Sequence, residues 1–355
     1  MHIERARLVE LGWDESFDTS LARLCDPTLE PGRIAADHGV DVLVHTARGR
    51  ARAGLAAALR DRGRPVAVGD WVAIRPAAGP PEVAAILDRR TAIARKVPDA
   101  EVREQVLAAN VDIVFIATAL DGDFNVRRVE RLLTVAYQSG ATPAVLLTKS
   151  DVGPVDASLA AVEGIAPSVP VVPVSPLTGA GVDAVRKLLA PGRTAVLVGS
   201  SGVGKSTLIN RLLGIDVLRT GDVHRTGQGR HTTTRRELLL VPSGGVVIDT
   251  PGLREIQLWT GEEALDRLFA DVEDLTLRCR FSNCRHGGEP GCAVAAALAD
   301  GRLDPDRWTG FRKLQRELRA VEARSNARLR AEDQRRWKAI RRAARGDVAA
   351  KHGGG

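Results

Sequence analysis

Residues 195–210, AVLVGSSGVGKSTLIN, constrain the fold of this chain more than any other stretch. An apolar run leads into GSSGVGKST at 199–207, which has the form G-x-x-x-x-G-K-[ST], and a helical spacing of apolar residues follows. A strand, a turn of this form and a helix, in that order, build a phosphate-binding loop from backbone amides at a helix N-terminus. The alternative, a glycine-rich surface turn, does not explain the strand and the helix on either side.

Each part of this loop has a predicted role in holding a nucleoside triphosphate. The glycines permit a tight turn and close backbone approach, Lys205 reaches the β- and γ-phosphates, and the Ser206 hydroxyl binds Mg²⁺. Further on, VVIDTPG at 246–252 places Asp249 at a strand end, where it is predicted to act on Mg²⁺, with the Gly252 amide facing the γ-phosphate. The predicted binding residues of the loop are Gly199, Ser200, Ser201, Gly202, Val203, Gly204, Lys205, Ser206 and Thr207.

Between these two motifs, TGQGRHTTTRRELLL is rich in glycine, threonine and arginine and predicts a mobile loop that leads into a strand. A threonine in such a loop can cap Mg²⁺ when the loop closes over a triphosphate. Spacing does not decide among Thr232, Thr233 and Thr234, and the predicted magnesium site takes Thr233, with Ser206 and Asp249, as ligands.

The residues that read the base are predicted upstream, in LLTKSD at 146–151, which matches the [NT]-K-x-D element of GTPases. The Asp151 carboxylate can accept both the N1 and N2 hydrogens of guanine, whereas adenine offers neither in that arrangement. The Lys149 stem is expected to stack on the ring, and Thr148 replaces the usual Asn, which loses an amide that braces the loop. The turn that begins at Ser175 in VPVSPLTGAG offers a backbone amide to the guanine O6, and Ser150 completes the set. A lysine-capped surface turn is the alternative.

The order of these motifs predicts a circular permutation. The base reader precedes the phosphate loop, the threonine loop and the aspartate, whereas an ordinary GTPase ends with its base reader. Permutation keeps the sheet and moves only the termini. Buried apolar runs alternate with helical stripes from about residue 100 to 270, which predicts βαβ units and a mostly parallel sheet.

A second kind of site is predicted in CRFSNCRHGGEPGC, where Cys279, Cys284, His286 and Cys292 have the spacing C-x4-C-x-H-x5-C. Three thiolates and one imidazole suit tetrahedral Zn²⁺, and a closed set of four protein ligands favours a structural role. Unligated cysteines on a loop are the alternative, and a redox role is disfavoured because no C-x-x-C is present. Cys25 stands alone and is predicted to be a buried or free thiol.

The two ends of the chain differ in composition. Short β-branched runs up to about residue 95 predict a barrel of about five strands, with a hairpin around Gly69-Asp70 and Trp71 in the core. Residues 1–28 carry few signals and are expected to be partly extended. Helical patterns span 262–278 and 305–345, and from Phe311 onward 14 Lys and Arg stand against 5 Asp and Glu, a net charge of +9 in a chain of net charge +7. Such a basic segment favours a polyanionic partner.

Together, the motif order, GRHTTT, DTPG and the Cys/His spacing resemble the ribosome-small-subunit-dependent GTPases of the RsgA, or YjeQ, family, over nearly the whole chain. The resemblance implies an α/β P-loop GTPase fold, circularly permuted and with a mostly parallel sheet. It divides the chain into an N-terminal segment plus OB-fold RNA-binding barrel at 1–95, the GTPase domain at 96–265, and an α-helical zinc-binding domain with a basic C-terminal helix at 266–355.

The resemblance also implies an activity and partners. It implies hydrolysis of GTP to GDP with Mg²⁺, slow alone and stimulated by the small ribosomal subunit during its late maturation, together with one structural zinc ion and contacts with ribosomal RNA. A cytoplasmic location is expected, because no apolar run of about 18 residues and no leader-like N-terminus is present. The protein is also expected to be a monomer. Leu253 follows Gly252 where Ras-like proteins carry a water-orienting Gln, so His231 is hypothesised to position the water. An RNA or loop contact is the alternative role of His231.

Three other functions compete with this interpretation. A zinc-containing RNA-binding protein can use GTP binding as a switch, with little functional turnover. An ATP-dependent kinase or transporter-like ATPase is disfavoured by TKSD and by the absence of a lid or an ATPase signature. A permuted GTPase acting on the large subunit is disfavoured by the C-terminal Cys/His cluster.

Overall fold

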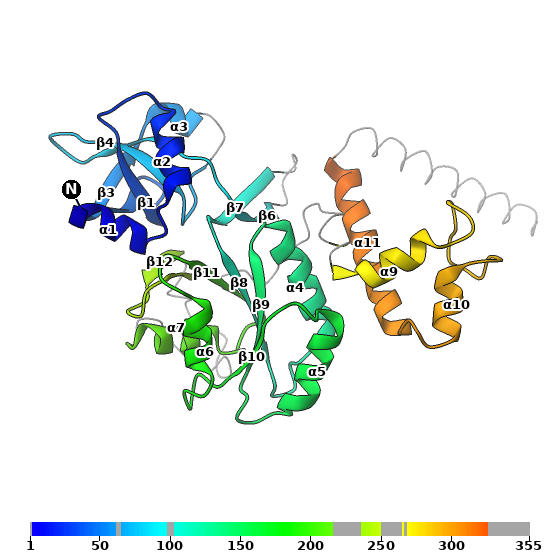
Figure 1. Cartoon of the computed structure of the whole chain (residues 1–355). Coiled ribbons are helices and arrows are strands. Elements are labelled where there is room, and N and C mark those ends of the chain that lie inside the picture. The colour runs from blue at the N-terminus through cyan, green and yellow to red at the C-terminus, as the bar shows by residue number, and fades with distance from the viewer. Residues whose placement is uncertain are drawn as a thin grey trace, which may run out of the picture. The chain divides into compact units, whose positions relative to one another are not determined.

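The computed structural model describes residues 2–61, 65–97, 103–215, 236–249, 265 and 268–325. The chain forms two compact units, one of residues 1–95 and 104–257 and the other of residues 96–103 and 258–355 (Figure 1). The first unit holds both the predicted barrel and the predicted nucleotide-binding sheet. The three domains with boundaries at 95 and 265 stay a prediction.

The predicted barrel of five strands is confirmed. Its strands run in the order β1-β2-β3-β5-β4, and β4 closes the barrel by pairing with β1. Inward-facing residues such as Ile34, Val44, Val72 and Val83 form its core. The elements are β1 (Glu30–Asp37), β2 (Val42–Thr46), β3 (Gly49–Leu55), α3 (Ala57–Asp61), β4 (Trp71–Arg75) and β5 (Glu82–Ile86).

The hairpin predicted around Gly69-Asp70 is wrong. Residues 65–70 form no strand, because the buried Asp70 carboxylate accepts a hydrogen bond from the Ala67 amide at 2.8 Å and so closes a tight turn. The same carboxylate pairs with the Arg89 guanidinium at 2.6 Å. Strand β4 therefore pairs with β1 and β5 instead.

The extended chain expected at residues 1–28 is also wrong, since helices α1 (His2–Glu10) and α2 (Glu15–Ala22) lie there. Asp14 caps α2 by accepting a hydrogen bond from the Ser16 amide at 3.0 Å. Trp13 and Phe17 pack on Trp71, with ring centroids 4.8 and 5.5 Å away. Trp71 is thereby buried, as predicted.

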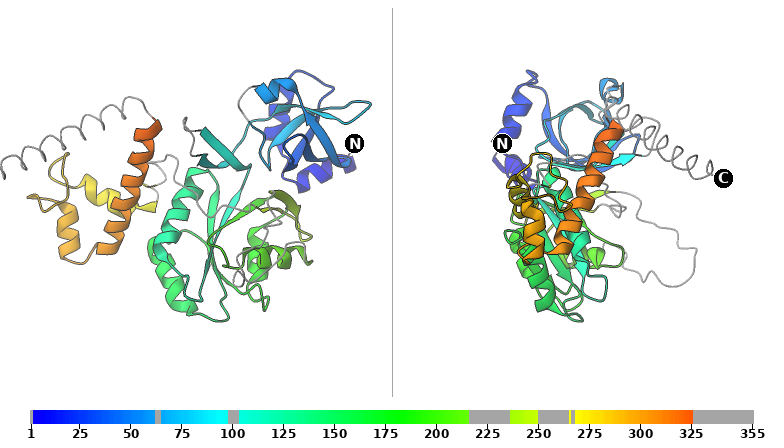
Figure 2. Two further views of the ribbon diagram at one scale, coloured as in Figure 1. Left: turned by 180° about the vertical axis from the view of Figure 1, so that it is seen from behind. Right: turned by 90° about the vertical axis from the view of Figure 1, so that its right-hand side faces the viewer.

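The nucleotide-binding sheet has the order β10-β9-β8-β11-β13-β12 and is parallel except for the antiparallel pair β12–β13. Helices cover both faces: α4 and α5 lie on one side, and α6 and α7 on the other (Figures 1 and 2). On β8 the side chains of Ile113 and Phe115 join the α6 and α7 core, as the alternation of side chains along a strand requires. The elements are β8 (Ile113–Ala119), α4 (Val126–Gln138), β9 (Thr142–Thr148), α5 (Val155–Ile165), β10 (Val171–Val174), α6 (Val182–Leu188), β11 (Thr194–Val198), α7 (Lys205–Leu213), β12 (Glu237–Leu240) and β13 (Val246–Asp249).

Barrel and sheet are joined within the first unit by a shared strand pairing and a buried cation. Barrel strand β1 pairs with sheet strand β12 at Ala36 and Glu237. The buried Arg33 guanidinium donates to the carbonyls of Leu11, of Gly69 at 3.2 Å and of Asn110 at 3.0 Å. Burial lowers the pKa of Arg33 to about 10, which leaves it charged at neutral pH. A further pair of strands, β6 (Ala92–Val97) and β7 (Arg103–Ala109), forms a separate two-stranded sheet.

The described part of the second unit is a small group of helices (Figures 1 and 2). It comprises α9 (Ala270–Leu277), α10 (Ala293–Ala299) and α11 (Pro305–Ser325). Phe269 and Phe311 pack with ring centroids 5.5 Å apart, and Arg307 of α11 pairs with Asp271 of α9 at 2.6 Å. The predicted helix at 305–345 is present as far as Ser325, and its remainder lies outside the described residues. No helix in the described parts of the chain is long and apolar enough to cross a membrane.

Candidate functional site

The predicted nucleotide-binding motifs lie at one edge of the sheet. Strands β8, β9, β10, β11 and β13 are parallel to one another. Their carboxyl ends therefore share an edge, where open α/β sheets bind ligands. Thr148 ends β9 and residues 149–151 follow it in a turn, the turn after β10 begins at Ser175, the phosphate loop follows β11, and Asp249 ends β13.

The phosphate loop has the backbone that its glycines predict. Gly199 has φ +144°, and a Cβ there would lie 2.2 Å from the Ala117 carbonyl oxygen of neighbouring strand β8, so only glycine fits. Gly202 and Gly204 also have positive φ, and α7 begins directly after Gly204, at Lys205. Ser206 and Thr207 lie half-buried in the first turn of α7. The first backbone amides of α7 thus follow a tight turn at the sheet edge.

Lys205 is directed back onto the loop. Its ammonium donates to the carbonyls of Gly199 at 2.8 Å and Ser200 at 2.6 Å. These carbonyls hold a cation at the centre of the loop, where a phosphate needs one. A bound phosphate oxygen would compete for the same donor.

Thr148 links the predicted base reader to the phosphate loop. Its fully buried hydroxyl lies 2.7 Å from the Val203 carbonyl oxygen and 3.1 Å from that of Thr118. The threonine therefore braces the loop across the sheet edge, which the loss of the usual Asn amide had put in question. The turn itself places Lys149 in a left-handed backbone (φ +56°), with its ammonium on the Asp121 carboxylate, and leaves Asp151 exposed.

The turn after β10 lies beside the phosphate loop. The buried Ser175 hydroxyl accepts a hydrogen bond from the Thr178 amide at 3.2 Å, which fixes the turn. A Cβ at Gly204 would lie 3.9 Å from Pro176 Cγ, so the two loops are in van der Waals range. The structure thus brings the turns at Thr148 and Ser175 to the phosphate loop. Gly252, His231 and the three candidate threonines, Thr232, Thr233 and Thr234, lie outside the described residues.

Sequence reasoning missed Arg128 at this edge. It stands in the first turn of α4, and its guanidinium donates to the Ser200 hydroxyl at 2.6 Å and pairs with the Asp123 carboxylate at 2.7 Å. Arg128 and Ser200 are 72 residues apart, so no motif spacing relates them. The one available signal was the position of FNVRR a few residues after a buried strand of the same sheet.

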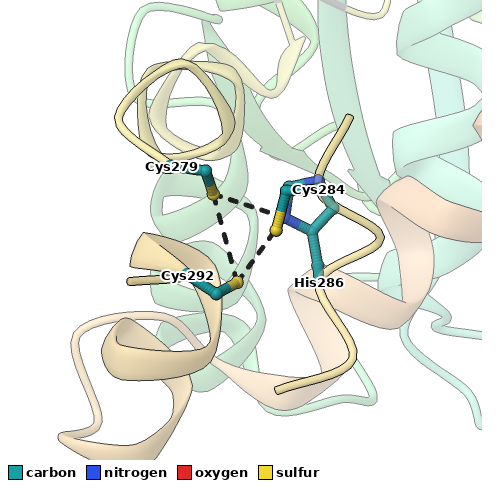
Figure 3. Close-up of side chains that lie close together, drawn as sticks. All are labelled: Cys279, Cys284, His286 and Cys292. Carbon is teal, nitrogen blue, oxygen red and sulfur yellow. Dashed lines mark hydrogen bonds between the residues drawn. The ribbon is translucent and has the colours of Figure 1, made fainter. Parts of the chain in front are cut away.

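The four predicted zinc ligands come together in the second unit (Figure 3). All their ligand atoms lie within 4.8 Å of one another. The sulfurs of Cys279 and Cys292 are 4.0 Å apart, and His286 Nδ1 is 3.5 and 3.7 Å from them. A tetrahedral ion with Zn–S bonds of about 2.3 Å needs sulfurs about 3.8 Å apart, so the residues fit zinc.

Local structure places each of these ligands. Cys279 follows α9, Cys292 caps α10 and accepts the Ala295 amide at 3.3 Å, and His286 takes a left-handed backbone with φ +59°. Glu289, which sequence reasoning did not single out, organises the loop between them. Its carboxylate accepts the amides of Arg285 at 3.0 Å and Gly287 at 2.7 Å.

The electrostatics of the cluster favour a metal-binding imidazole. Burial lowers the pKa of His286, and the Arg312 charge acts in the same direction, so the ring is neutral at pH 7. Burial raises the pKa of the Cys284 thiol to about 11, and the neighbouring thiols of Cys292 and Cys279 add to the shift. Zinc would therefore displace a proton from Cys284 when it binds.

Fold and site together define a circularly permuted P-loop GTPase with a barrel before the sheet and a Cys/His-containing helical unit after it. The model of the family described as RsgA GTPase matches residues 86–259. A relative from Opitutus terrae, Small ribosomal subunit biogenesis GTPase RsgA, is 47% identical over 94% of this chain and 95% of its own. A relative of the same name from Streptomyces coelicolor is 44% identical over 99% of this chain and 98% of its own. The chain belongs to the RsgA GTPase family.

Solved structures agree with this assignment. The crystal structure of YjeQ from Thermotoga maritima is 27% identical and has a TM-score of 0.62, with 82% of this chain and 98% of that chain covered. The structure of YloQ, a circularly permuted GTPase, has a TM-score of 0.58 over 82% of this chain and 96% of that one. At 20% identity it supports the fold alone.

Proposed function

We propose that this GTPase hydrolyses GTP at the carboxyl edge of its sheet during biogenesis of the small ribosomal subunit, and that the subunit stimulates its turnover. The names of its relatives support the process, and one contact carries the assignment of the site. The Thr148 hydroxyl lies 2.7 Å from the Val203 carbonyl oxygen, so the TKSD turn is bonded directly to the phosphate loop. A base and a triphosphate of one nucleotide can therefore be held by adjoining turns.

Guanine is the base that this turn is suited to accept. Asp151 is exposed within this turn, where its carboxylate can accept both hydrogens, from N1 and N2. The Lys149 stem would stack on the ring after its ammonium leaves Asp121, and a backbone amide of the turn after Ser175 would meet O6. Ser150 completes this turn, with its amide 3.4 Å from the Val174 carbonyl oxygen.

The remaining residues act on the triphosphate. Residues 199–207 surround the phosphates with amides, and Lys205 neutralises their charge. Ser206, Thr233 and Asp249 would hold Mg²⁺, which neutralises charge developing on the β- and γ-phosphate oxygens. The Gly252 amide would face the γ-phosphate, and His231 would position the attacking water, because Leu253 cannot. A chain that lacks its own water-orienting Gln has reason to depend on a partner.

The other parts of the chain supply the partner and the scaffold. The net charge of +9 from Phe311 onward favours a polyanion such as ribosomal RNA, and the barrel is proposed to bind RNA as well. One structural zinc ion, held by Cys279, Cys284, His286 and Cys292, would stabilise the helical unit. The protein is proposed to act as a cytoplasmic monomer.

The first experiment is nucleotide hydrolysis by the purified protein, with GTP or ATP and with or without isolated small ribosomal subunits. GTP turnover that rises at least tenfold with the subunit, and no comparable ATP turnover, is the expected result. Indifference to the subunit would remove the assigned partner and leave the GTPase.

Base recognition is tested separately with Asp151→Asn. This variant should lose GTP and gain xanthosine triphosphate, because the amide donates where the carboxylate accepts. The expected change in preference is about 100-fold or more, as for other sites whose hydrogen bonds fit one substrate and not its analogue. Unaltered preference would show that the TKSD turn does not read the base.

A further inference from the structure

Two side-chain cations meet on one residue of the phosphate loop. The Arg128 guanidinium donates to the Ser200 hydroxyl at 2.6 Å, and the Lys205 ammonium donates to the Ser200 carbonyl, also at 2.6 Å. Lys205 belongs to the loop motif, whereas Arg128 comes from α4, beyond neighbouring strand β8. Positive charge therefore reaches the loop from a second element of the sheet edge.

The contacts of Arg128 hold it only loosely: besides Ser200 and the Asp123 carboxylate, its guanidinium donates to the Asp123 carbonyl at 3.3 Å. Its ion pair with Asp123 leaves the two side chains 37% and 36% exposed, and pairs of such exposure contribute about 0–1 kcal/mol. Helix α4 has its own anchors: Asn125 caps it by accepting the Arg128 amide at 3.0 Å, and Val129 and Leu133 are buried beneath it. The guanidinium can therefore change partners at little cost.

A phosphate would be the better partner. Guanidinium and phosphate form charge-assisted, often bidentate hydrogen bonds that are about twice as strong as neutral ones. The Ser200 hydroxyl is a neutral acceptor, and the Asp123 carboxylate is partly solvated. A nucleotide seated on the loop brings its most negative group, the terminal phosphate, into the neighbourhood of this cation.

We propose that Arg128 is a further nucleotide-binding residue of this GTPase, and this proposal rests on the proposed function. When GTP binds, the Arg128 guanidinium leaves Ser200 and Asp123 and binds the terminal phosphate. GDP lacks that phosphate, so Arg128 sets the preference of the protein for GTP over GDP. An arginine supplied by the chain itself also stabilises the charge that spreads over the transferred phosphoryl group.

Arg127 provides a matched control on the same helical turn. Its guanidinium pairs with the Glu130 carboxylate of α4 at 2.8 Å rather than with the phosphate loop. Affinities for fluorescently labelled GDP and for a labelled β,γ-imido analogue of GTP are measured by titration for the wild type, Arg128→Ala, Arg128→Lys and Arg127→Ala. We expect Arg128→Ala to weaken the GTP analogue about tenfold and GDP less than twofold.

The other variants sharpen the result. Arg127→Ala should change neither affinity, and Arg128→Lys should recover part of the loss because lysine meets phosphate as a point charge. Asp123→Asn should leave GDP unchanged and tighten the GTP analogue about twofold, since the phosphate no longer competes with a carboxylate.

Three results would overturn the proposal. Equal weakening of both nucleotides by Arg128→Ala would mean that the arginine only braces the loop, and no weakening would mean that it has no role. Loss of the GTP analogue in Asp123→Asn, as large as in Arg128→Ala, would mean that the intact ion pair is the functional element. A wild type that binds neither guanine nucleotide would overturn the proposed function itself, which separates the two failures.

Discussion

The nucleotide site and the Cys/His cluster differ in how their side chains are arranged before a ligand binds. At the sheet edge the cations already hold protein groups: Lys205 holds loop carbonyls, Lys149 holds Asp121, and Arg128 holds Ser200 and Asp123. In the cluster, all four ligand atoms converge within 4.8 Å. The contacts at the sheet edge are exchangeable, whereas the four side chains that could hold a metal ion form a preformed centre.

The largest effect is expected from breaking the preformed centre with Cys292→Ser. Serine keeps an oxygen that can cap α10 where the sulfur now accepts the Ala295 amide, so the change removes the metal ligand and spares the cap. A quarter of the roughly 10–16 kcal/mol of structural zinc binding is about 2.5–4 kcal/mol, or roughly 300-fold in affinity. Competition with a chromophoric chelator measures this affinity. Cys25→Ser, at an exposed free cysteine, is the control, and unchanged zinc affinity would contradict the assignment.

The Lys205→Ala variant tests the exchangeable contacts of the nucleotide site. GTP hydrolysis should fall about 100-fold, because a preorganised charge on the phosphates is lost. The melting temperature should hardly change, since Lys205 is half-buried and its ammonium donates to two carbonyls of its own loop. Hydrolysis and thermal unfolding are measured on the same preparation. A large loss of stability would show that Lys205 holds the loop together and would end the contrast between the two sites.

The smallest effect is expected from Glu289→Gln, which tests whether the hydrogen bonds of Glu289 help to hold the metal-binding residues in place. The neutral amide keeps the size of the side chain but weakens its acceptance of the Arg285 and Gly287 amides. Supporting residues of this kind typically change metal affinity 10–100-fold, and we expect the lower figure here because the side chain is retained. Competition with a chromophoric chelator measures the zinc affinity of this variant as well. Zinc affinity equal to that of the wild type would mean that the loop holds its shape without Glu289.

Much of the first unit could be predicted from the sequence because its signals are local. Buried parallel strands are continuous apolar runs, as at 113–119, and the phosphate loop is a contiguous motif whose glycines are required by φ and by the approach of Ala117. The four metal ligands also lie within one short segment. Local patterns of this kind depend on neither distant contacts nor tertiary packing.

The missed features depend on distant partners. The turn at 65–70 is closed by Asp70, which also pairs with Arg89. The alternation of apolar residues in the sequence does not predict this ion pair. Helices α1 and α2 are short, and the buried residues Leu8, Leu11, Trp13 and Phe17 of the helices and the segment between them follow no single period, because Gly12, with φ +92°, turns the chain there. The role of Thr148 as a brace also required the structure, since Val203 lies 55 residues away.

Arg33 has a consequence for how such a protein can be recombined. Its guanidinium donates to one carbonyl at Leu11, between the N-terminal helices, one at Gly69, in the turn before β4, and one at Asn110, in the chain that enters the sheet. A barrel transplanted to a foreign sheet would keep a buried cation but lose an acceptor, and a buried charge without its partners costs several kcal/mol. The barrel and the sheet can therefore be exchanged between proteins only together. An exchange of one of them alone succeeds only if the residue at position 33 and its hydrogen-bond acceptors are redesigned.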